Sequence, residues 1–165
     1  MGSLYSKQGR YTKAEPLLLK ALEMYKQLLG EEHPDVASSL NNLGNLYSNQ
    51  GRYTKAEPLL LKALQMKKQL LGSSHPNVAN SLNNLGSLYY LQGRYTKVEP
   101  LLLKALEIYK QLLGEEHPNT QIVHKNYLYF LHQVFRENRQ EDLSDEISFK
   151  IIFRDGEIIL RRLLK

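Results

Sequence analysis

Cysteine is absent from this sequence of 165 residues. Its absence excludes disulfide bonds, thiolate metal sites and thiol nucleophiles, and it favours a reducing, cytoplasmic location. Long apolar runs are missing too, because no stretch approaches the ~18 continuous apolar residues of a membrane-spanning helix. The segment that begins at Met1 lacks the charged and apolar regions of a signal peptide. We therefore predict a cytoplasmic protein that does not associate with membranes.

Clustered positive charge is also lacking, although the formal net charge is +5. The lysines occur singly at a constant spacing, and they share predicted helix faces with glutamates such as Glu15, Glu23 and Glu57. A nucleic-acid surface needs several cations together, because its affinity grows with the number of phosphates neutralised. The charge pattern therefore favours solvated helix faces and predicts no nucleic-acid partner.

What the sequence does contain is an internal repeat with a period of 42 residues. The pentapeptide Gly9–Lys13 returns unchanged at Gly51–Lys55 and at Gly93–Lys97, and a His-Pro pair keeps the same period. Residues 11–52 and 53–94 differ at only nine positions. A repeat of this kind is typical of solenoids, in which each unit buries its apolar surface against its neighbours.

Each unit carries the pattern of two helices. The first, predicted over about residues 34–50, has a proline in its first turn and a glycine directly after it. The second, predicted over about 53–71, has a broad apolar stripe. We expect Pro58 near the free N–H groups of the first turn, where a proline is tolerated. Gly44 and Gly86 should let the two helices of a unit approach closely.

Six residues of the unit have the relative spacings of the tetratricopeptide consensus: Leu43, Gly44, Tyr47, Gly51, Ala56 and Ala63. With its 42-residue period and its Leu-Gly-x-x-His-Pro turn, the sequence resembles the kinesin-light-chain-like subclass of these repeats, which is abundant in bacterial, notably cyanobacterial, proteins. The resemblance covers about residues 1–136. It implies an all-α, right-handed superhelical solenoid of antiparallel helix pairs, whose concave groove binds a protein or peptide.

We therefore expect a repeat array followed by a tail without repeats, over residues 1–136 and 137–165. The array would contain a partial unit and three further units, over 1–10, 11–52, 53–94 and 95–136. Tyr127 and Leu128 replace the Leu-Gly pair in the last unit, so its helix should end the regular stack. In the tail, Asp155-Gly156 between apolar runs is typical of a β-hairpin, but the same residues also fit a helix broken at Gly156.

Four of the nine differences between units fall on the first helix, which lines the concave groove in tetratricopeptide proteins. A groove that selects its partner would show this pattern, as would an exposed face that drifts freely. The groove residues that we predict are Asn41, Asn42, Asn45, Asn49, Asn80, Asn83, Asn84, Ser87, Tyr90, Lys125, Asn126 and Tyr129. Asn42, Asn84 and Asn126 repeat strictly, and their amides fit either pairing with a bound peptide or an inter-helix hydrogen bond that fixes the stacking. In the related carboxylate-clamp proteins asparagines act with basic side chains, for which Lys7 and Lys125 are the cations on this face.

Motifs of catalysis are not found. His33, His75 and His117 stand in identical turns one repeat apart, so we interpret them as turn residues that cannot converge on one metal ion. His124 and His132 lie two helical turns apart without a nearby carboxylate triad. The phosphate loop, the dinucleotide fingerprint and the nucleophile elbow are all missing. We predict that the protein is not an enzyme and binds neither a metal nor a cofactor.

The function that we predict is a protein–protein interaction scaffold, with a peptide or protein segment in the groove and Tyr90 and Tyr129 as aromatic anchors. Two alternatives remain open. The first is self-association into a homo-oligomer, through the truncated first unit or through the apolar tail. The second is a role as the interaction part of a larger signalling protein.

Overall fold

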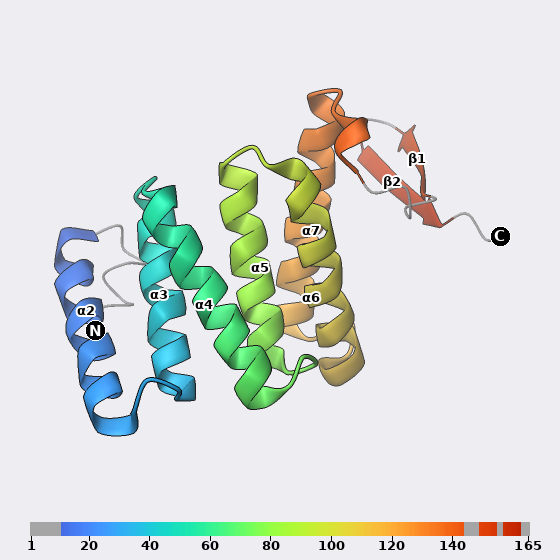
Figure 1. Cartoon of the computed structure of the whole chain (residues 1–165). Helices are drawn as coiled ribbons and strands as arrows, with labels where there is room; N and C mark the ends of the chain where they lie inside the picture. The colour runs from blue at the N-terminus through green and yellow to red at the C-terminus, as the bar shows by residue number, and fades with distance from the viewer. Residues whose placement is uncertain (1–10, 144–148, 155–156, 163–165) are drawn as a thin grey trace.

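The computed structural model of the protein describes residues 11–143, 149–154 and 157–162. The helices, labelled from α2 onward in Figure 1, are α2 (Tyr11–Leu29), α3 (Pro34–Asn49), α4 (Tyr53–Leu71), α5 (Pro76–Leu91), α6 (Val98–Leu113) and α7 (Pro118–Arg136). Two short 3-10 helices, η1 (Tyr95–Lys97) and η2 (Gln140–Asp142), precede α6 and follow α7. Lys7 and the predicted partial unit 1–10 lie outside the described residues.

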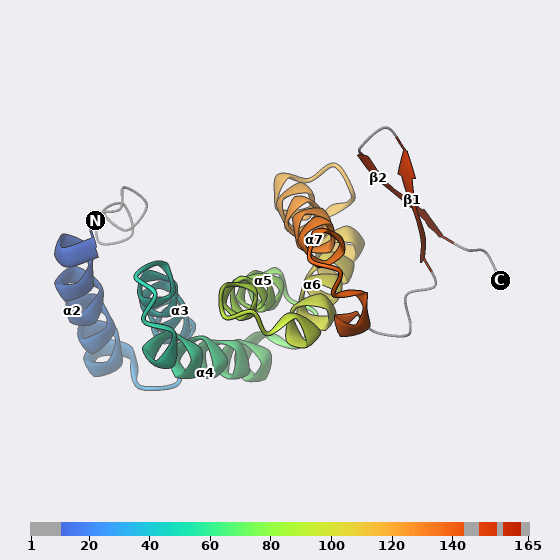
Figure 2. The ribbon, with the colours of Figure 1, turned by 90° about the horizontal axis from the view of Figure 1, so that it is seen from above.

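Consecutive helices pack antiparallel and side by side, which confirms the predicted all-α solenoid (Figure 1). Seen from above, the ribbon curves, with α3, α5 and α7 along its inner side and α2, α4 and α6 along its outer side (Figure 2). We call the surface formed by α3, α5 and α7 the inner face. None of the described helices combines the length and the apolar character needed to cross a membrane.

Every first helix of a unit begins with the same cap. The ring Nδ1 atoms of His33, His75 and His117 accept hydrogen bonds from the backbone N–H two residues later, at 3.2, 3.1 and 3.1 Å. Each cap satisfies one of the N–H groups that a helix start leaves free, and a proline occupies the next position. The interpretation of these histidines as turn residues is confirmed.

Pro58 lies further into its helix than the sequence predicts. Because α4 already begins at Tyr53, Pro58 follows a completed first turn, on a side of the helix that is exposed to solvent. The carbonyl group that its missing N–H leaves free can bind water there, so the proline is tolerated. The equivalent Pro100 lies in the first turn of its helix, since α6 begins only at Val98, after η1.

Glycine allows close contact between the two helices of a unit, as predicted. A Cβ atom on Gly44 would lie 2.7 Å from Cγ of Leu60 in α4, which is closer than two carbon atoms can pack. A Cβ atom on Gly86 would lie 3.2 Å from Cδ2 of Leu102 in α6. The leucines and alanines around these contacts form most of the continuous apolar core.

The tail contains two strands, β1 (Phe149–Arg154) and β2 (Glu157–Arg162). They pair antiparallel, with Ile151 opposite Leu160 and Arg154 opposite Glu157. Of the two structures that the sequence allowed, the β-hairpin is therefore confirmed. Its connection, residues 155–156, lies outside the described residues, and the division of the chain into domains at residue 136 stays a prediction.

Candidate functional site

All the predicted groove residues lie on α3, α5 and α7, but their exposure differs. Six are exposed: Asn42, Asn49, Asn80, Ser87, Lys125 and Tyr129. Five are half-buried: Asn45, Asn83, Asn84, Tyr90 and Asn126. Asn41 is buried, with only 4% of its surface exposed. Its side chain is therefore used inside the stack and is not presented on the inner face.

Amide groups of successive units are hydrogen-bonded to one another. Asn84 Nδ2 donates to Asn41 Oδ1 at 3.2 Å, and Asn126 Nδ2 donates to Asn83 Oδ1 at 2.9 Å. In both pairs, the strictly repeated asparagine of one unit donates to the residue just before the equivalent asparagine of the preceding unit. Of the two interpretations of the repeated asparagines, the structure shows the contact between helices for Asn84 and Asn126.

A pocket of about 170 Å³ opens on the inner face between α5, α6 and α7. Its lining residues are Gly86, Ser87, Tyr90, Leu91, Val98, Leu102, Asn126, Tyr129 and Phe130. Four of the predicted groove residues are among them. The pocket is smaller than the cavities of several hundred Å³ that usually hold cofactors and drug-sized ligands, so it suits a single side chain.

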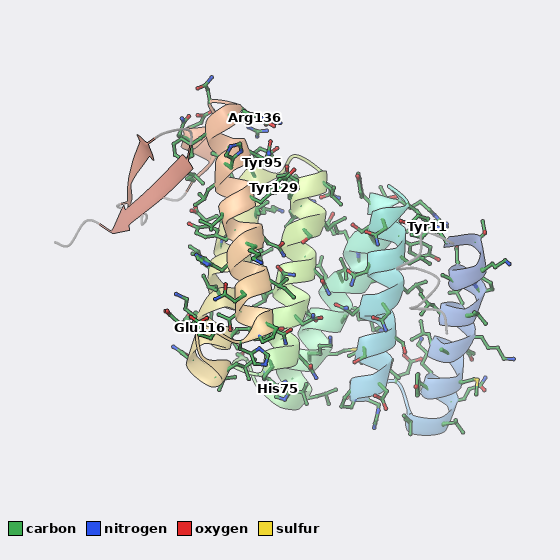
Figure 3. All side chains as sticks on the ribbon, turned by 180° about the vertical axis from the view of Figure 1, so that it is seen from behind. Tyr11, His75, Tyr95, Glu116, Tyr129 and Arg136 are labelled. Carbon is green, nitrogen blue, oxygen red and sulfur yellow. The ribbon has the colours of Figure 1, made fainter. Side chains whose placement is uncertain are left out.

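Aromatic rings form one wall of this pocket. The ring of Tyr90 stacks on Tyr95, with centroids 5.6 Å apart, and contacts the ring of Tyr129 edge-on at 5.7 Å. The Arg139 guanidinium lies 4.2 Å from the centroid of the Tyr95 ring. Figure 3 shows Tyr95 and Tyr129 close together near the C-terminal end of α7. Burial, with Tyr129 beside it, raises the pKa of the Tyr90 hydroxyl far above its usual value, so this group remains a neutral hydrogen-bond donor.

Lys67 is a buried cation that the sequence analysis did not assign to the site. Its side chain extends from α4 and is only 4% exposed. The Nζ atom donates to Ser81 Oγ at 3.0 Å, and Ser81 Oγ donates to Asn41 Oδ1 at 3.3 Å. Burial lowers the pKa of Lys67 from 10.5 to about 8. The sequence distinguishes this position only by the residue type, because the two equivalent positions carry Tyr25 and Tyr109 in place of a lysine.

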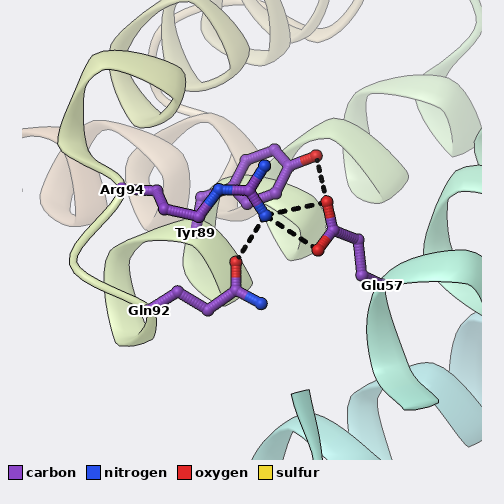
Figure 4. A network of polar contacts seen from close by, with 4 residues as sticks. All are labelled: Glu57, Tyr89, Gln92 and Arg94. Atoms are coloured by element: carbon purple, nitrogen blue, oxygen red, sulfur yellow. Dashed lines mark hydrogen bonds and ion pairs between the residues drawn. The ribbon is translucent and has the colours of Figure 1, made fainter. Parts of the chain in front are cut away.

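Polar contacts join the second helix of one helix pair to the next pair, as Figure 4 shows for Glu57 of α4 with Tyr89 of α5 and with Arg94. Arg94 Nη1 donates to both carboxylate oxygens of Glu57, at 2.9 and 2.8 Å, and Tyr89 Oη donates to Oε1 at 3.1 Å. Burial alone would raise the pKa of Glu57, but the hydrogen bonds from Arg94 and Tyr89 outweigh it and lower the pKa. The same set recurs with Glu15, Tyr47 and Arg52.

The last unit replaces this contact. Leu131 stands where the other units have Tyr47 and Tyr89. Tyr127, one turn earlier on α7, donates instead to Glu99 Oε1 at 3.3 Å, and Glu99 is only 1% exposed. These contacts join neighbouring helix pairs, and none of the residues that form them lines the pocket on the inner face.

Metal chemistry has no candidate centre in the part of the chain that the structure describes. No three or more histidine, aspartate or glutamate side chains there are grouped so that they could hold one ion. His33, His75 and His117 are each occupied as a helix cap. What the described residues offer is a polar and aromatic surface for binding.

Comparison with known proteins identifies the repeat. The family model described as tetratricopeptide repeat matches residues 1–69, 35–111 and 78–127. The crystal structure of BtubC (BKLC) from P. vanneervenii is similar, with a TM-score of 0.68 and 25% sequence identity, over 88% of this chain and 61% of that chain. A kinesin-light-chain-like protein from Podosopora anserina with nearly identical TPR-like repeats has a TM-score of 0.72 and 23% identity, over 86% of this chain and 66% of that chain.

These matches also define what the comparison covers. The chain spans less than two thirds of the length of the two solved structures. No curated protein matches the sequence.

Proposed function

Because the chain belongs to the tetratricopeptide repeat family, whose repeats mediate protein–protein interaction, we propose that it is a scaffold that holds an extended segment of a partner protein on its inner face. In this proposal the protein acts by binding and not as an enzyme. The segment crosses α3, α5 and α7, because these helices lie side by side on the inner side of the curve (Figure 2).

The pocket between α5, α6 and α7 is the observation that carries this proposal. Its floor is apolar, since Val98, Leu102 and Phe130 are buried there, and Ser87 and Asn126 add polar groups. One apolar side chain of the partner fits this combination, with its own backbone bonded to the polar groups. A side chain that fills such a pocket contributes much of the affinity of an extended segment.

Exposed amides extend this surface beyond the pocket. Asn42, Asn49 and Asn80 are exposed on α3 and α5, and their amides carry hydrogen-bond donors and acceptors, of which Asn80 Oδ1 already accepts from Asn84. An extended peptide has unpaired N–H and C=O groups along its backbone, so these amides can bind it irrespective of its sequence. The pocket would then supply the selectivity.

The test uses peptides selected on the purified chain from a random display library, with affinities measured by fluorescence polarisation. We expect Ser87→Tyr to fill the pocket and to weaken binding about tenfold, or ~1.4 kcal/mol. The matched control is Ser73→Tyr, which adds the same side chain at an exposed turn position. If the two variants bind the selected peptides equally well, the pocket is not the anchor and the proposal is wrong.

Self-association is a second candidate, favoured by apolar side chains that are exposed on α2. Leu28 is 74% exposed, Met24 49% and Leu19 44%. Large apolar side chains that gather on an exposed surface often mark an interface. Light scattering over a wide concentration range tests it: Leu28→Ser with Met24→Ser should lower the mass of an oligomer to that of one chain. A wild-type protein with the mass of one chain at every concentration would exclude this candidate.

A further inference from the structure

Two serines occupy the turn between α4 and α5, where the other units carry two glutamates. Ser73-Ser74 aligns with Glu31-Glu32 and with Glu115-Glu116 in the repeat. The flanking residues are the same in all three turns, since a Leu-Gly pair precedes them and a His-Pro pair follows. The turns before α5 and α7 lie at the same end of the molecule, where Figure 3 labels His75 and Glu116. One turn of the set therefore lacks the negative charge that the other two carry.

In the two acidic turns, the first glutamate forms an ion pair with the lysine five residues before it. Glu31 Oε1 lies 3.1 Å from Lys26 Nζ, and Glu115 Oε1 lies 3.1 Å from Lys110 Nζ. Glu31 Oε2 also lies 3.9 Å from Nζ of Lys62 in α4. Each acidic turn is therefore attached by its charge to the helix that precedes it.

The turn before α5 keeps the lysine but has no acidic residue to pair with it. Lys68 stands five residues before Ser73, as Lys26 does before Glu31. Its side chain is exposed, and it has no acidic partner among the residues that the structure describes. Ser73 is exposed as well, in a turn directly after the end of α4, so its hydroxyl group is accessible to another protein.

We propose that Ser73 is a phosphorylation site, and that its phosphate replaces the missing glutamates by pairing with Lys68. A protein kinase that uses a nucleoside triphosphate carries out the reaction. Ser73 Oγ attacks the γ-phosphorus, so that a new O–P bond forms and the bond from the γ-phosphorus to the bridging oxygen breaks. The hydroxyl proton passes to a base of the kinase, and the nucleoside diphosphate leaves.

The charge of a phosphate suits this turn. A phosphoserine carries about −1.5 to −2 at pH 7, so one modification supplies about the charge of two glutamates. Exposed pairs of single charges, such as Lys26 with Glu31, contribute little to stability. A phosphate attracts a lysine more strongly and has three acceptor oxygens, so it can order a turn that a single carboxylate orders weakly.

The ion pairs also distinguish Ser73 from its neighbour Ser74. Glu32 and Glu116, which align with Ser74, form no ion pair within the described part of the chain. By analogy, a phosphate on Ser74 would have no lysine placed to receive it. The site is separate from the pocket on the inner face, because none of the residues that line the pocket belongs to this turn.

Mass spectrometry tests the modification itself. The chain is isolated from the cells that produce it, with phosphatases inhibited, and its phosphorylated residues are mapped by peptide sequencing. We expect phosphate on Ser73. A chain that carries no phosphate on Ser73, or carries it only on Ser74, would overturn the inference and would leave the proposed binding function untouched.

Phosphorus NMR tests the pairing with Lys68, on chains phosphorylated on Ser73 alone by incorporation of phosphoserine during translation. The second pKa of phosphoserine is about 6, and a neighbouring lysine lowers it because it stabilises the dianion. We expect this pKa to lie about half a unit lower in the folded chain than in the same chain unfolded in urea. Lys68→Gln should abolish the difference.

Two controls show whether Lys68 acts specifically. Lys20→Gln removes an exposed lysine of α2 and should leave the phosphate pKa of the folded chain unchanged. In chains phosphorylated on Ser74 instead, Lys68→Gln should have little effect. A phosphate on Ser73 that titrates alike in the folded and unfolded chain, or that responds equally to Lys20→Gln and Lys68→Gln, would contradict the pairing and overturn the inference.

Discussion

Position 67 carries a lysine where the equivalent positions carry Tyr25 and Tyr109, and we expect this single residue to change the stability of the fold. Burial lowers its pKa from 10.5 to about 8. A lysine that loses its proton more easily in the folded than in the unfolded state destabilises the fold as long as both states are protonated. The destabilisation is complete below about pH 8 and is released as the pH rises toward 10.5.

We therefore expect the free energy of unfolding of the wild type to increase by about 2 kcal/mol between neutral pH and the region just below the titration of the tyrosines. Lys67→Met removes the titrating group and should not show this increase. Urea denaturation of both proteins at the two pH values measures the difference. An identical pH dependence of the two proteins would mean that Lys67 is not desolvated as described.

The ionisation of Glu57 stabilises the fold, in contrast to that of Lys67. Its contacts with Arg94 and Tyr89 lower its pKa below 4.5. A carboxylate of this kind stabilises the fold above its usual pKa, and its contribution is lost as the pH falls through the lowered value. We expect Glu57→Gln to reduce the free energy of unfolding by about 1 kcal/mol at neutral pH, since the pair is partly exposed to solvent.

The difference in the free energy of unfolding between the wild type and Glu57→Gln should shrink in acid, near pH 3. The matched control is Glu107→Gln, because Glu107 forms an ion pair with Lys104 that is about half exposed and should contribute almost nothing. An effect of Glu57→Gln no larger than that of Glu107→Gln would contradict the role assigned to the contact between units.

At the scale of helices, the sequence predicts well those features that depend on neighbouring residues in the chain, such as the starts of helices. The His-Pro pairs mark the starts of α3, α5 and α7 because proline and the capping ring act on the next few residues. Contacts between units are different. Asn41 and Asn84, or Glu57 and Arg94, are far apart in the chain, and their pairing depends on the rotation of one helix against another. For this reason the sequence placed Asn41 on the exposed surface and did not reveal where Lys67 points.

Gly44 and Gly86 show how the packing of a helix pair decides between similar substitutions. Alanine at either position gains about 1 kcal/mol of helix propensity over glycine. At Gly44, the new methyl group would lie 2.7 Å from Cγ of Leu60, which is fully buried, so the leucine would have to shift inside the core. Overpacking of a core costs about 1–3 kcal/mol, so the clash outweighs the gain. At Gly86, the distance of 3.2 Å to the end of Leu102 requires only a small shift.

We therefore expect Gly44→Ala to lower the free energy of unfolding by about 1 kcal/mol and Gly86→Ala to leave it nearly unchanged or to raise it slightly. Chemical denaturation of the two variants under the same conditions makes the comparison. Equal effects would mean that the two helix pairs are packed alike, contrary to the structure.

The whole molecule is a row of helices in which extensive contacts join neighbours, and this limits how far a local change can act. The stability of a solenoid is approximately the sum of the stabilities of its units and of the contacts between adjacent units. The contact at the last boundary, Tyr127 with Glu99, differs from the Glu57 and Glu15 contacts before it. Each boundary is thus stabilised separately, and the inner face keeps its shape only where the units beneath it stay folded.

Hydrogen exchange can test this description for the entire chain. In Gly44→Ala, the amides of α3 and α4 should lose protection, because the substituted contact lies between these helices, whereas the amides of α7 should keep theirs. The matched protein is Gly86→Ala, in which protection should change little anywhere. An equal loss of protection in α3, α4 and α7 would show that the solenoid opens as one cooperative unit. In that case a partner bound over α5 and α7 would stabilise α3 as much as the helices that it touches.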